Sequence, residues 1–174
     1  MAAGSVPSAG RSSGRAEARS AARLAAVQSL YQIDLTGISA ERAVTEFLEH
    51  LASGGEDGPA PKNFDRRRYG EIVRGAVARR DELDTMVASA LAEGWVLDRL
   101  DAVLRAILRA GAWELTAGGG IPPKVVINEF VNVAHAFFED KEPGFVNGVL
   151  DRLARVVRPV EMEPQSREQA PDPG

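Results

Sequence analysis

A helical repeat of apolar residues between positions 97 and 115 constrains the fold more than any other feature of the sequence. At about 100° per residue, these side chains fall in one stripe about 100° wide. The stripe consists of Leu97, Leu100, Leu104, Ile107, Leu108, Gly111 and Leu115. A stripe of this width must face other helices. Gly111 predicts a close approach of two helices, since glycine in a helix interior otherwise costs about 1 kcal/mol.

The same period recurs through most of the chain. Residues 123–138 and 143–157 each carry an apolar face at helical spacing, and no segment alternates at the period of two that strands show. We therefore predict an all-α fold, a single-domain bundle of about seven helices. The predicted helices are Ala16–Leu35, Ala40–Ala52, Asn63–Ala78, Asp81–Leu91, Leu97–Leu115, Pro123–Phe138 and Pro143–Val157.

Both ends of the chain differ in composition from this helical region. Residues 1–14 are rich in Ala, Gly, Ser and Pro, and residues 159–174 are rich in Pro, Glu and Gln. Neither segment can bury enough apolar surface to offset the entropy lost on ordering, so both are predicted to be disordered tails. They flank one predicted helical domain, residues 15–158, whose strongest internal loop is Ser53–Pro61.

Arginine recurs at every fourth position near the start of the chain. The net charge of −4 argues against nucleic-acid binding over the whole surface, but Arg11, Arg15, Arg19 and Arg23 are accompanied by a single acid, Glu17. A four-residue step advances only about 40° around a helix, so the last three arginines are predicted to lie along one side. This distribution indicates one local anion-binding surface.

The first helix is expected to present these guanidinium groups to solvent. Its larger apolar residues, Leu24, Val27, Tyr31 and Leu35, point about 125° away and are predicted to dock on the core. Guanidinium groups match phosphate oxygens and stack on unpaired bases, as recognition of single-stranded RNA requires. The alternative is a solvated helix face whose charge is partly offset by Glu17.

Three further residues are candidates for the same surface. Tyr31 lies at the seam between the arginines and the predicted core, where it either packs half-buried or offers its ring to a base or a partner protein. Lys141 lies in a polar turn, and Phe145 lies near the N-terminus of the next helix, where backbone N–H groups favour anions. The Phe145 ring is either a hydrophobic staple or a stacking surface beside an anion site.

Two features outside this surface leave alternatives open. Arg66, Arg67 and Arg68 form a basic run at the start of a predicted helix, where positive charge opposes the helix dipole. They are either solvated or an auxiliary anion contact. Trp113 lies off the leucine stripe and is either covered by another helix or part of a contact surface.

The other charged residues in the helix bodies are predicted to be structural. Glu114 and Glu129 are expected to serve as hydrogen-bond partners. Arg109 is placed on a polar face of its helix, with Asp98 and Asp101 nearby for pairing.

The residues that catalysis or metal binding requires are not arranged for either. The chain has no cysteine, and its two histidines, His50 and His135, have no metal-ligand spacing around them. The Gly118–Gly120 run lacks the preceding strand and the following Lys-Ser/Thr of a phosphate-binding loop. We predict a protein that is not an enzyme, with no catalytic residue, no metal and no cofactor. Because no apolar run approaches the roughly 20 residues that cross a bilayer, we expect no membrane contact and a cytoplasmic location.

Four stretches of the sequence together resemble one protein family. They are Ala18–Leu35 (ARSAARLAAVQSLYQIDL), Val103–Leu115 (VLRAILRAGAWEL), Ile121–Glu129 (IPPKVVINE) and Phe145–Arg152 (FVNGVLDR). In this order and spacing they resemble the NusB family of bacterial transcription antitermination proteins, and the likeness runs from Arg15 to Pro159.

The resemblance implies an all-α RNA-binding adaptor. It implies a heterodimer with the ribosomal protein NusE, which binds the boxA element of ribosomal RNA transcripts and helps the RNA polymerase antitermination complex resist termination. The RNA-binding residues that it implies are those at matching positions of the motifs. They are Arg15, Arg19 and Arg23 of the N-terminal segment, Tyr31 at the end of AVQSLY, Phe145 of FVNG, and Lys141 in the loop before it.

Other functions stay open at this point. Similar helical domains occur at the N-terminus of RNA cytosine methyltransferases, so a detached RNA-binding domain of such an enzyme is the alternative. The complete enzyme needs a doubly wound domain with catalytic cysteines, whereas this chain ends at Gly174 and has no cysteine. A purely structural helical scaffold would leave the arginines as surface charge. The sequence also leaves open whether the free protein forms a homodimer.

Overall fold

The computed structural model describes residues 9–54, 63–118 and 120–164, and within these ranges all regular structure is helical. The helices are α1 (Ala9–Thr36), α2 (Ala40–Ala52), α3 (Arg66–Ala78), α4 (Arg80–Ala90), the 3-10 helix η1 (Leu97–Arg99), α5 (Ala102–Thr116), α6 (Pro123–Phe137), α7 (Glu142–Val157) and α8 (Pro159–Met162). The all-α prediction is confirmed. No helix in these ranges is long and apolar enough to cross a membrane.

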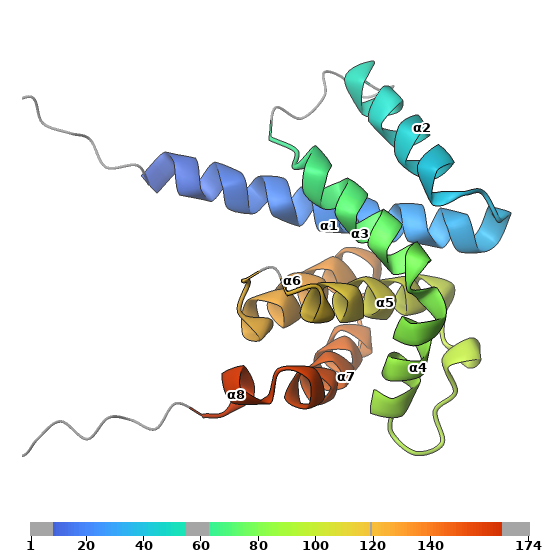
Figure 1. The fold of residues 1–174 in the computed structure, drawn as a ribbon, viewed down its shortest axis with the longest axis vertical. Coiled ribbons are helices and arrows are strands. Elements are labelled where there is room, and N and C mark those ends of the chain that lie inside the picture. The colour runs from blue at the N-terminus through green and yellow to red at the C-terminus, as the bar shows by residue number, and fades with distance from the viewer. Residues whose placement is uncertain (1–8, 55–62, 119, 165–174) are drawn as a thin grey trace, which may run out of the picture.

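The leucine-rich helix α5 lies at the centre of the bundle. It contacts α1 and α3 on one side and α6 and α7 on the other (Figure 1). The predicted close approach at Gly111 is confirmed, because a Cβ at this position would lie 2.8 Å from Cδ1 of Leu150 in α7. A β-carbon does not fit at that distance, so glycine allows α5 and α7 to pack closely.

The break before α5 differs from the prediction of one helix over Leu97–Leu115. Leu100 is extended, with φ −70° and ψ 152°, and Asp101 starts a new helix as its N-cap. The Asp101 carboxylate accepts hydrogen bonds from the backbone N–H groups of Val103 and Leu104. An aspartate cap satisfies amides that the helix itself leaves unpaired, which favours a start at this point.

The docking face of α1 also differs from the prediction. The buried residues are Ala22, Ala26, Leu30 and Ile33, whereas Leu35 is 63% exposed. Small alanine side chains let α1 approach α3 and α5 closely, so the largest apolar residues do not mark the buried side. At 100° per residue, the arginines therefore lie on the same side of α1 as its docking face.

The predicted tails are partly helical. Helix α1 begins at Ala9 instead of Ala16, and α8 forms within the predicted C-terminal tail, where its Met162 is buried beside α6 and α7. A single large apolar side chain that finds a site on the bundle is enough to order this turn. Residues 1–8 and 165–174 of the predicted tails, and residues 55–62 of the predicted loop, lie outside the described ranges.

Contacts between α1 and α3 position the first turn of α3. The hydroxyl groups of Ser29 and Tyr69 lie 2.7 Å apart in the buried interface, at hydrogen-bond distance. Nearer the chain start, the backbone N–H of Asp65 donates to the carbonyl oxygen of Ala18 at 3.2 Å. The start of α3 is thus fixed beside the N-terminal half of α1 (Figure 1).

Candidate nucleic-acid interface

The N-terminal half of α1 carries two guanidinium groups that no carboxylate neutralises in the described part of the chain. Arg15 is exposed and Arg19 is half-buried. No ion pair involves either side chain among the described residues, whereas the exposed Arg42 of α2 pairs with Glu46 one turn away at 2.7 Å. Two unpaired cations on one side of a helix form an anion-binding surface.

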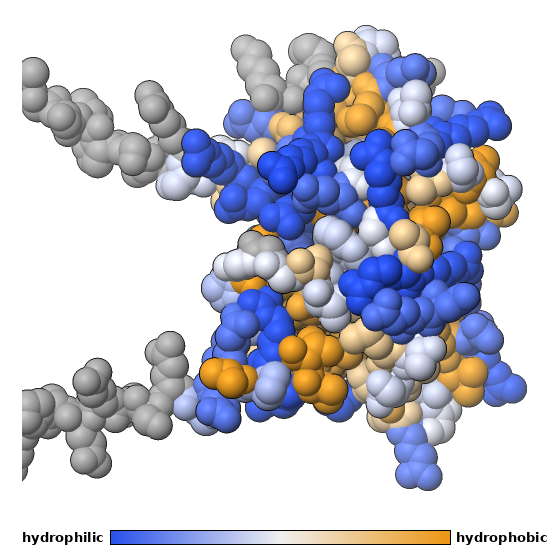
Figure 2. Space-filling model, viewed as in Figure 1, coloured by the Kyte–Doolittle hydropathy of each residue, from blue (hydrophilic) through white to orange (hydrophobic). Residues whose placement is uncertain are grey.

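Helix α3 extends this basic surface. Arg66 is exposed in the first turn of α3, next to the Asp65–Ala18 backbone hydrogen bond that joins the two helices. Figure 2 shows hydrophilic side chains gathered over the N-terminal half of α1 and the start of α3. We call Arg15, Arg19 and Arg66 the basic surface.

Arg23 does not belong to the basic surface. Its side chain is 2% exposed, and its guanidinium donates to the carboxylate of Glu114 in α5 at 2.6 and 2.9 Å. A carboxylate oxygen of Glu129 in α6 lies 3.4 Å away. The prediction that Arg23 presents its guanidinium to solvent for phosphate is wrong, because α5 and α6 cover α1 one turn after Arg19. The prediction that Glu114 and Glu129 are structural partners is confirmed.

Surrounding carboxylates keep this buried guanidinium ionised. Burial acts to lower the pKa of Arg23, but hydrogen bonding to Glu114 and the charges of Glu114, Glu129 and Asp65 raise it above the ordinary value. The hydroxyl of Ser20 also donates to Glu129 at 2.7 Å. This network fixes the register of α1 on α5 and α6, and it thereby positions Arg15 and Arg19 at the edge of the bundle.

A second buried guanidinium, that of Arg109, is also structural. Arg109 is 3% exposed and donates to Asp84 of α4 at 2.7 Å and to Asp34 of α1 at 3.0 Å. The expected polar face with Asp98 and Asp101 is therefore wrong, since α1 and α4 cover this side of α5. Burial acts to lower the pKa of Arg109, but both aspartates together raise it.

A shallow groove between α1 and α6 runs from the basic surface toward Tyr31. Its volume is about 240 Å³, and its lining includes Leu24 of α1 and Asn132 of α6. Tyr31 lies half-buried against the core, as predicted. It is about 18 Å along the helix axis from Arg19 and about 120° around it, so these two side chains do not form one compact site.

Lys141 and Phe145 form a second candidate site at the start of α7. Lys141 is exposed at the N-cap position, and its carbonyl oxygen accepts a hydrogen bond from the backbone N–H of Phe145. Asp140, the residue before the cap, is polar, so Phe145 has no apolar partner there for a hydrophobic staple. Its ring packs instead on Trp95, with centroids 5.1 Å apart.

Trp95 is a candidate residue that sequence reasoning missed. Its side chain is 52% exposed, and together with Leu104, Lys141 and Phe145 it lines a largely apolar pocket of about 350 Å³. The available signal was a tryptophan directly after Gly94, outside every helical stripe. In the described residues, no group of three or more His, Cys, Asp or Glu side chains could hold a metal ion.

Comparison with known proteins identifies the family. The model of the NusB family matches residues 20–155. The chain is 44% identical over 135 residues to the transcription antitermination protein NusB of Caulobacter vibrioides, which covers 78% of this chain and 91% of that protein. These are antitermination proteins, so a detached methyltransferase domain has no support.

Solved structures agree with the sequence comparison. NusB of T. maritima superposes with a TM-score of 0.69 and 28% identity, covering 83% of this chain and 95% of that one. A structure described as antitermination factors NusB and NusE in complex with dsRNA superposes with a TM-score of 0.66 and 29% identity, covering 80% and 98%. The chain belongs to the NusB family of transcription antitermination proteins, which are not enzymes.

Proposed function

We propose that this chain is an RNA-binding adaptor that pairs with the ribosomal protein NusE and binds boxA-type single-stranded RNA in ribosomal RNA transcripts. It acts there within the RNA polymerase antitermination complex, in the cytoplasm. The observation that carries the proposal is the pair of unneutralised guanidinium groups, Arg15 and Arg19, on a chain of this family. A related NusB has been solved with NusE and RNA, which supports the choice of partners.

Phosphate is the natural ligand of the basic surface. Guanidinium groups form charge-assisted hydrogen bonds with phosphate oxygens, and Arg15 and Arg19 need not first leave a carboxylate to do so. Each phosphate contact releases condensed counterions, so the affinity for RNA should fall steeply as salt increases.

The aromatic residues provide the contacts with bases. Phe145 and Trp95 lie side by side in a pocket beside the exposed Lys141. Stacking of an unpaired base on such a ring is worth about 1–3 kcal/mol. An RNA strand that contacts both Arg19 and Phe145 passes Tyr31, along the groove between α1 and α6.

The test compares two double variants that remove the same charge. Arg15→Ala/Arg19→Ala removes the basic surface of α1, whereas Arg42→Ala/Arg155→Ala removes two exposed guanidinium groups that each pair with an acid one turn away. Fluorescence anisotropy of labelled boxA-type RNA is measured across a salt series, with and without NusE.

We expect NusE to raise the affinity of the wild-type chain and the first double variant to weaken binding and flatten the salt dependence by roughly 0.7 per lost contact. The second double variant should bind as the wild type does. Equal loss in both double variants would contradict a local site. Absence of binding by the wild-type chain with NusE at low salt would overturn the proposal, and a structural scaffold would then be the better account.

A further inference from the structure

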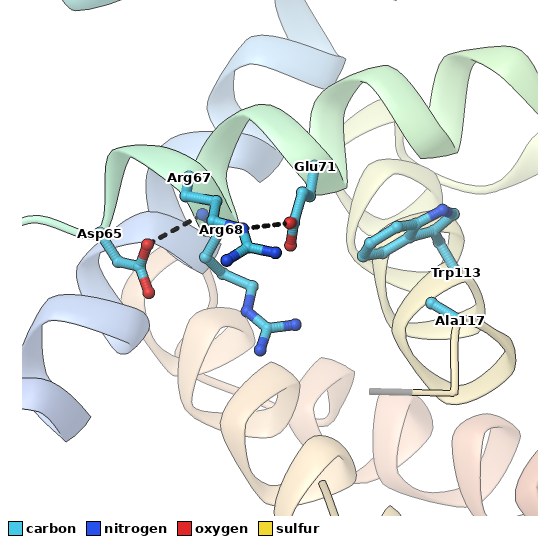
Figure 3. Close-up of a pocket in the computed structure, with 6 residues that line it drawn as sticks. All are labelled: Asp65, Arg67, Arg68, Glu71, Trp113 and Ala117. Atoms are coloured by element: carbon cyan, nitrogen blue, oxygen red, sulfur yellow. Dashed lines mark hydrogen bonds and ion pairs between the residues drawn. The ribbon is translucent and has the colours of Figure 1, made fainter. Parts of the chain in front are cut away.

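An open hollow lies between the first turns of α3 and the end of α5. It has a volume of about 490 Å³, and it is lined by Asp65, Arg67, Arg68 and Glu71 of α3 with Trp113 and Ala117 of α5. Figure 3 shows the two guanidinium groups below α3, with the indole ring across from them. Two cations opposite an aromatic ring match the two parts of a nucleotide, its phosphate and its base.

Both guanidinium groups in this hollow are available to an anion. Arg67 pairs with Glu71 at 2.8 Å, but its side chain is 89% exposed, and exposed pairs of this kind contribute little to stability. Arg68 lies 3.8 Å from Glu114, whose carboxylate already binds Arg23 at 2.6 Å. A phosphate in the hollow would therefore displace only weak contacts.

The two remaining acids of this region are already engaged. The carboxylate of Asp65 accepts the backbone N–H of Arg68 at 2.9 Å as the N-cap of α3. Glu114 is buried in the Arg23 network. Their charges are thus matched by partners within the fold and do not close the hollow to an anion.

Trp113 is held with part of its ring on the hollow. A Cβ at Gly75 would lie 2.0 Å from Nε1 of the indole, so glycine in α3 is what lets this edge of the ring pack against the helix. The side chain is half-buried, and it also lines the hollow. Both alternatives raised by the sequence hold together: α3 covers one edge of Trp113, and the rest lies on a potential contact surface.

The hollow adjoins the basic surface. Its lining residue Asp65 is joined through its backbone N–H to Ala18, which lies between Arg15 and Arg19 on α1. Arg66, part of the basic surface, directly precedes Arg67. An RNA strand on the basic surface can therefore pass around the start of α3 and reach the hollow.

We propose that this hollow is an accessory RNA site, in which Arg67 and Arg68 bind a phosphate and Trp113 contacts the base of one nucleotide flanking the boxA-type element. The inference rests on the proposed function and extends its footprint from α1 to α3 and α5. The ligand is a single-stranded nucleotide of the same RNA molecule.

Arg67→Ala tests the site with a close control. Arg42→Ala removes the same charge from the same kind of exposed pair, since Arg42 binds Glu46 at 2.7 Å and Arg67 binds Glu71 at 2.8 Å. Labelled boxA-type RNA with and without flanking nucleotides is titrated into each full-length variant in the presence of NusE. A second readout is the fluorescence of a Trp95→Phe protein, in which Trp113 is the only tryptophan.

We expect Arg67→Ala to weaken binding of the extended RNA by roughly tenfold, as loss of a charged hydrogen bond does, and to lower its salt slope by about 0.7. Arg42→Ala should have no effect, and the extended RNA should quench Trp113 more than the short RNA does. If Arg67→Ala binds like the wild type while Arg15→Ala/Arg19→Ala binds weakly, the accessory site is wrong and the proposed function stands. If the wild type binds neither RNA with NusE, the proposed function is overturned and this inference with it.

Discussion

Removing the charge of Glu114 should destabilise the protein strongly, because this carboxylate neutralises a guanidinium that cannot reach water. Arg23 and Glu114 side chains are each 2% exposed, and their closest atoms lie 2.6 Å apart. Loss of one partner of a buried pair typically costs about 3–5 kcal/mol. In Glu114→Gln the carboxylate of Glu129 remains 3.4 Å from Arg23, so we expect the lower end, about 3 kcal/mol. For a chain of this length that corresponds to a fall in Tm of roughly 6–12 °C.

Urea denaturation followed by circular dichroism measures this loss. Glu46→Gln is the control, because its partner Arg42 is 67% exposed and exposed pairs contribute about 0–1 kcal/mol. A loss below about 1 kcal/mol in Glu114→Gln would refute the reasoning, since the pair would then behave as a solvated one. The double variant Arg23→Met/Glu114→Leu, which replaces both charges with apolar groups, should lose less stability than Glu114→Gln.

Three further outcomes follow from the structure. Arg23→Met should leave the salt slope of RNA binding unchanged at temperatures where the variant is folded; a decrease of about 0.7, measured by anisotropy, would mean that Arg23 contacts phosphate after all. Asp101→Ala removes the N-cap of α5 and should cost about 1 kcal/mol in urea denaturation, and an unchanged midpoint would contradict the observed break before α5. Hydrogen bonding to Arg74 holds the pKa of Glu41 below its ordinary value, so this pair stabilises the fold above the unfolded-state pKa and is lost as pH falls through the folded-state pKa. Between about pH 5 and pH 3, stability should therefore fall less in Glu41→Gln than in the wild type, and parallel pH profiles from thermal melts would count against the pair.

The regular part of the fold was predictable because apolar period alone identifies amphipathic helices. It places the α5 stripe and the close approach at Gly111 correctly. It fails at Asp101, because a strong cap interrupts a stripe that continues on both sides of it. It also fails for α1, where the buried side is made of small residues such as Ala22 and Ala26, which carry little weight in a count of large apolar residues.

The candidate site was predictable only to the level of residue type. Three arginines at four-residue spacing are equivalent in sequence, but the end of the covering helices separates the buried Arg23 from the accessible Arg15 and Arg19. That boundary depends on where α5 and α6 lie against α1, which is a tertiary property. Trp95 was missed for a related reason, since its contact with Phe145 joins residues that are far apart in sequence.

Sedimentation velocity of the chain with NusE and labelled boxA-type RNA tests the central claim most directly, because it reports which molecules travel together. The account predicts that the label moves in one species that contains one copy of each protein, that this species is lost at high salt, and that Arg15→Ala/Arg19→Ala reduces it at moderate salt. The same runs show whether the free chain is a homodimer. A label that sediments as free RNA at low salt, although both proteins are present and folded, would contradict the account.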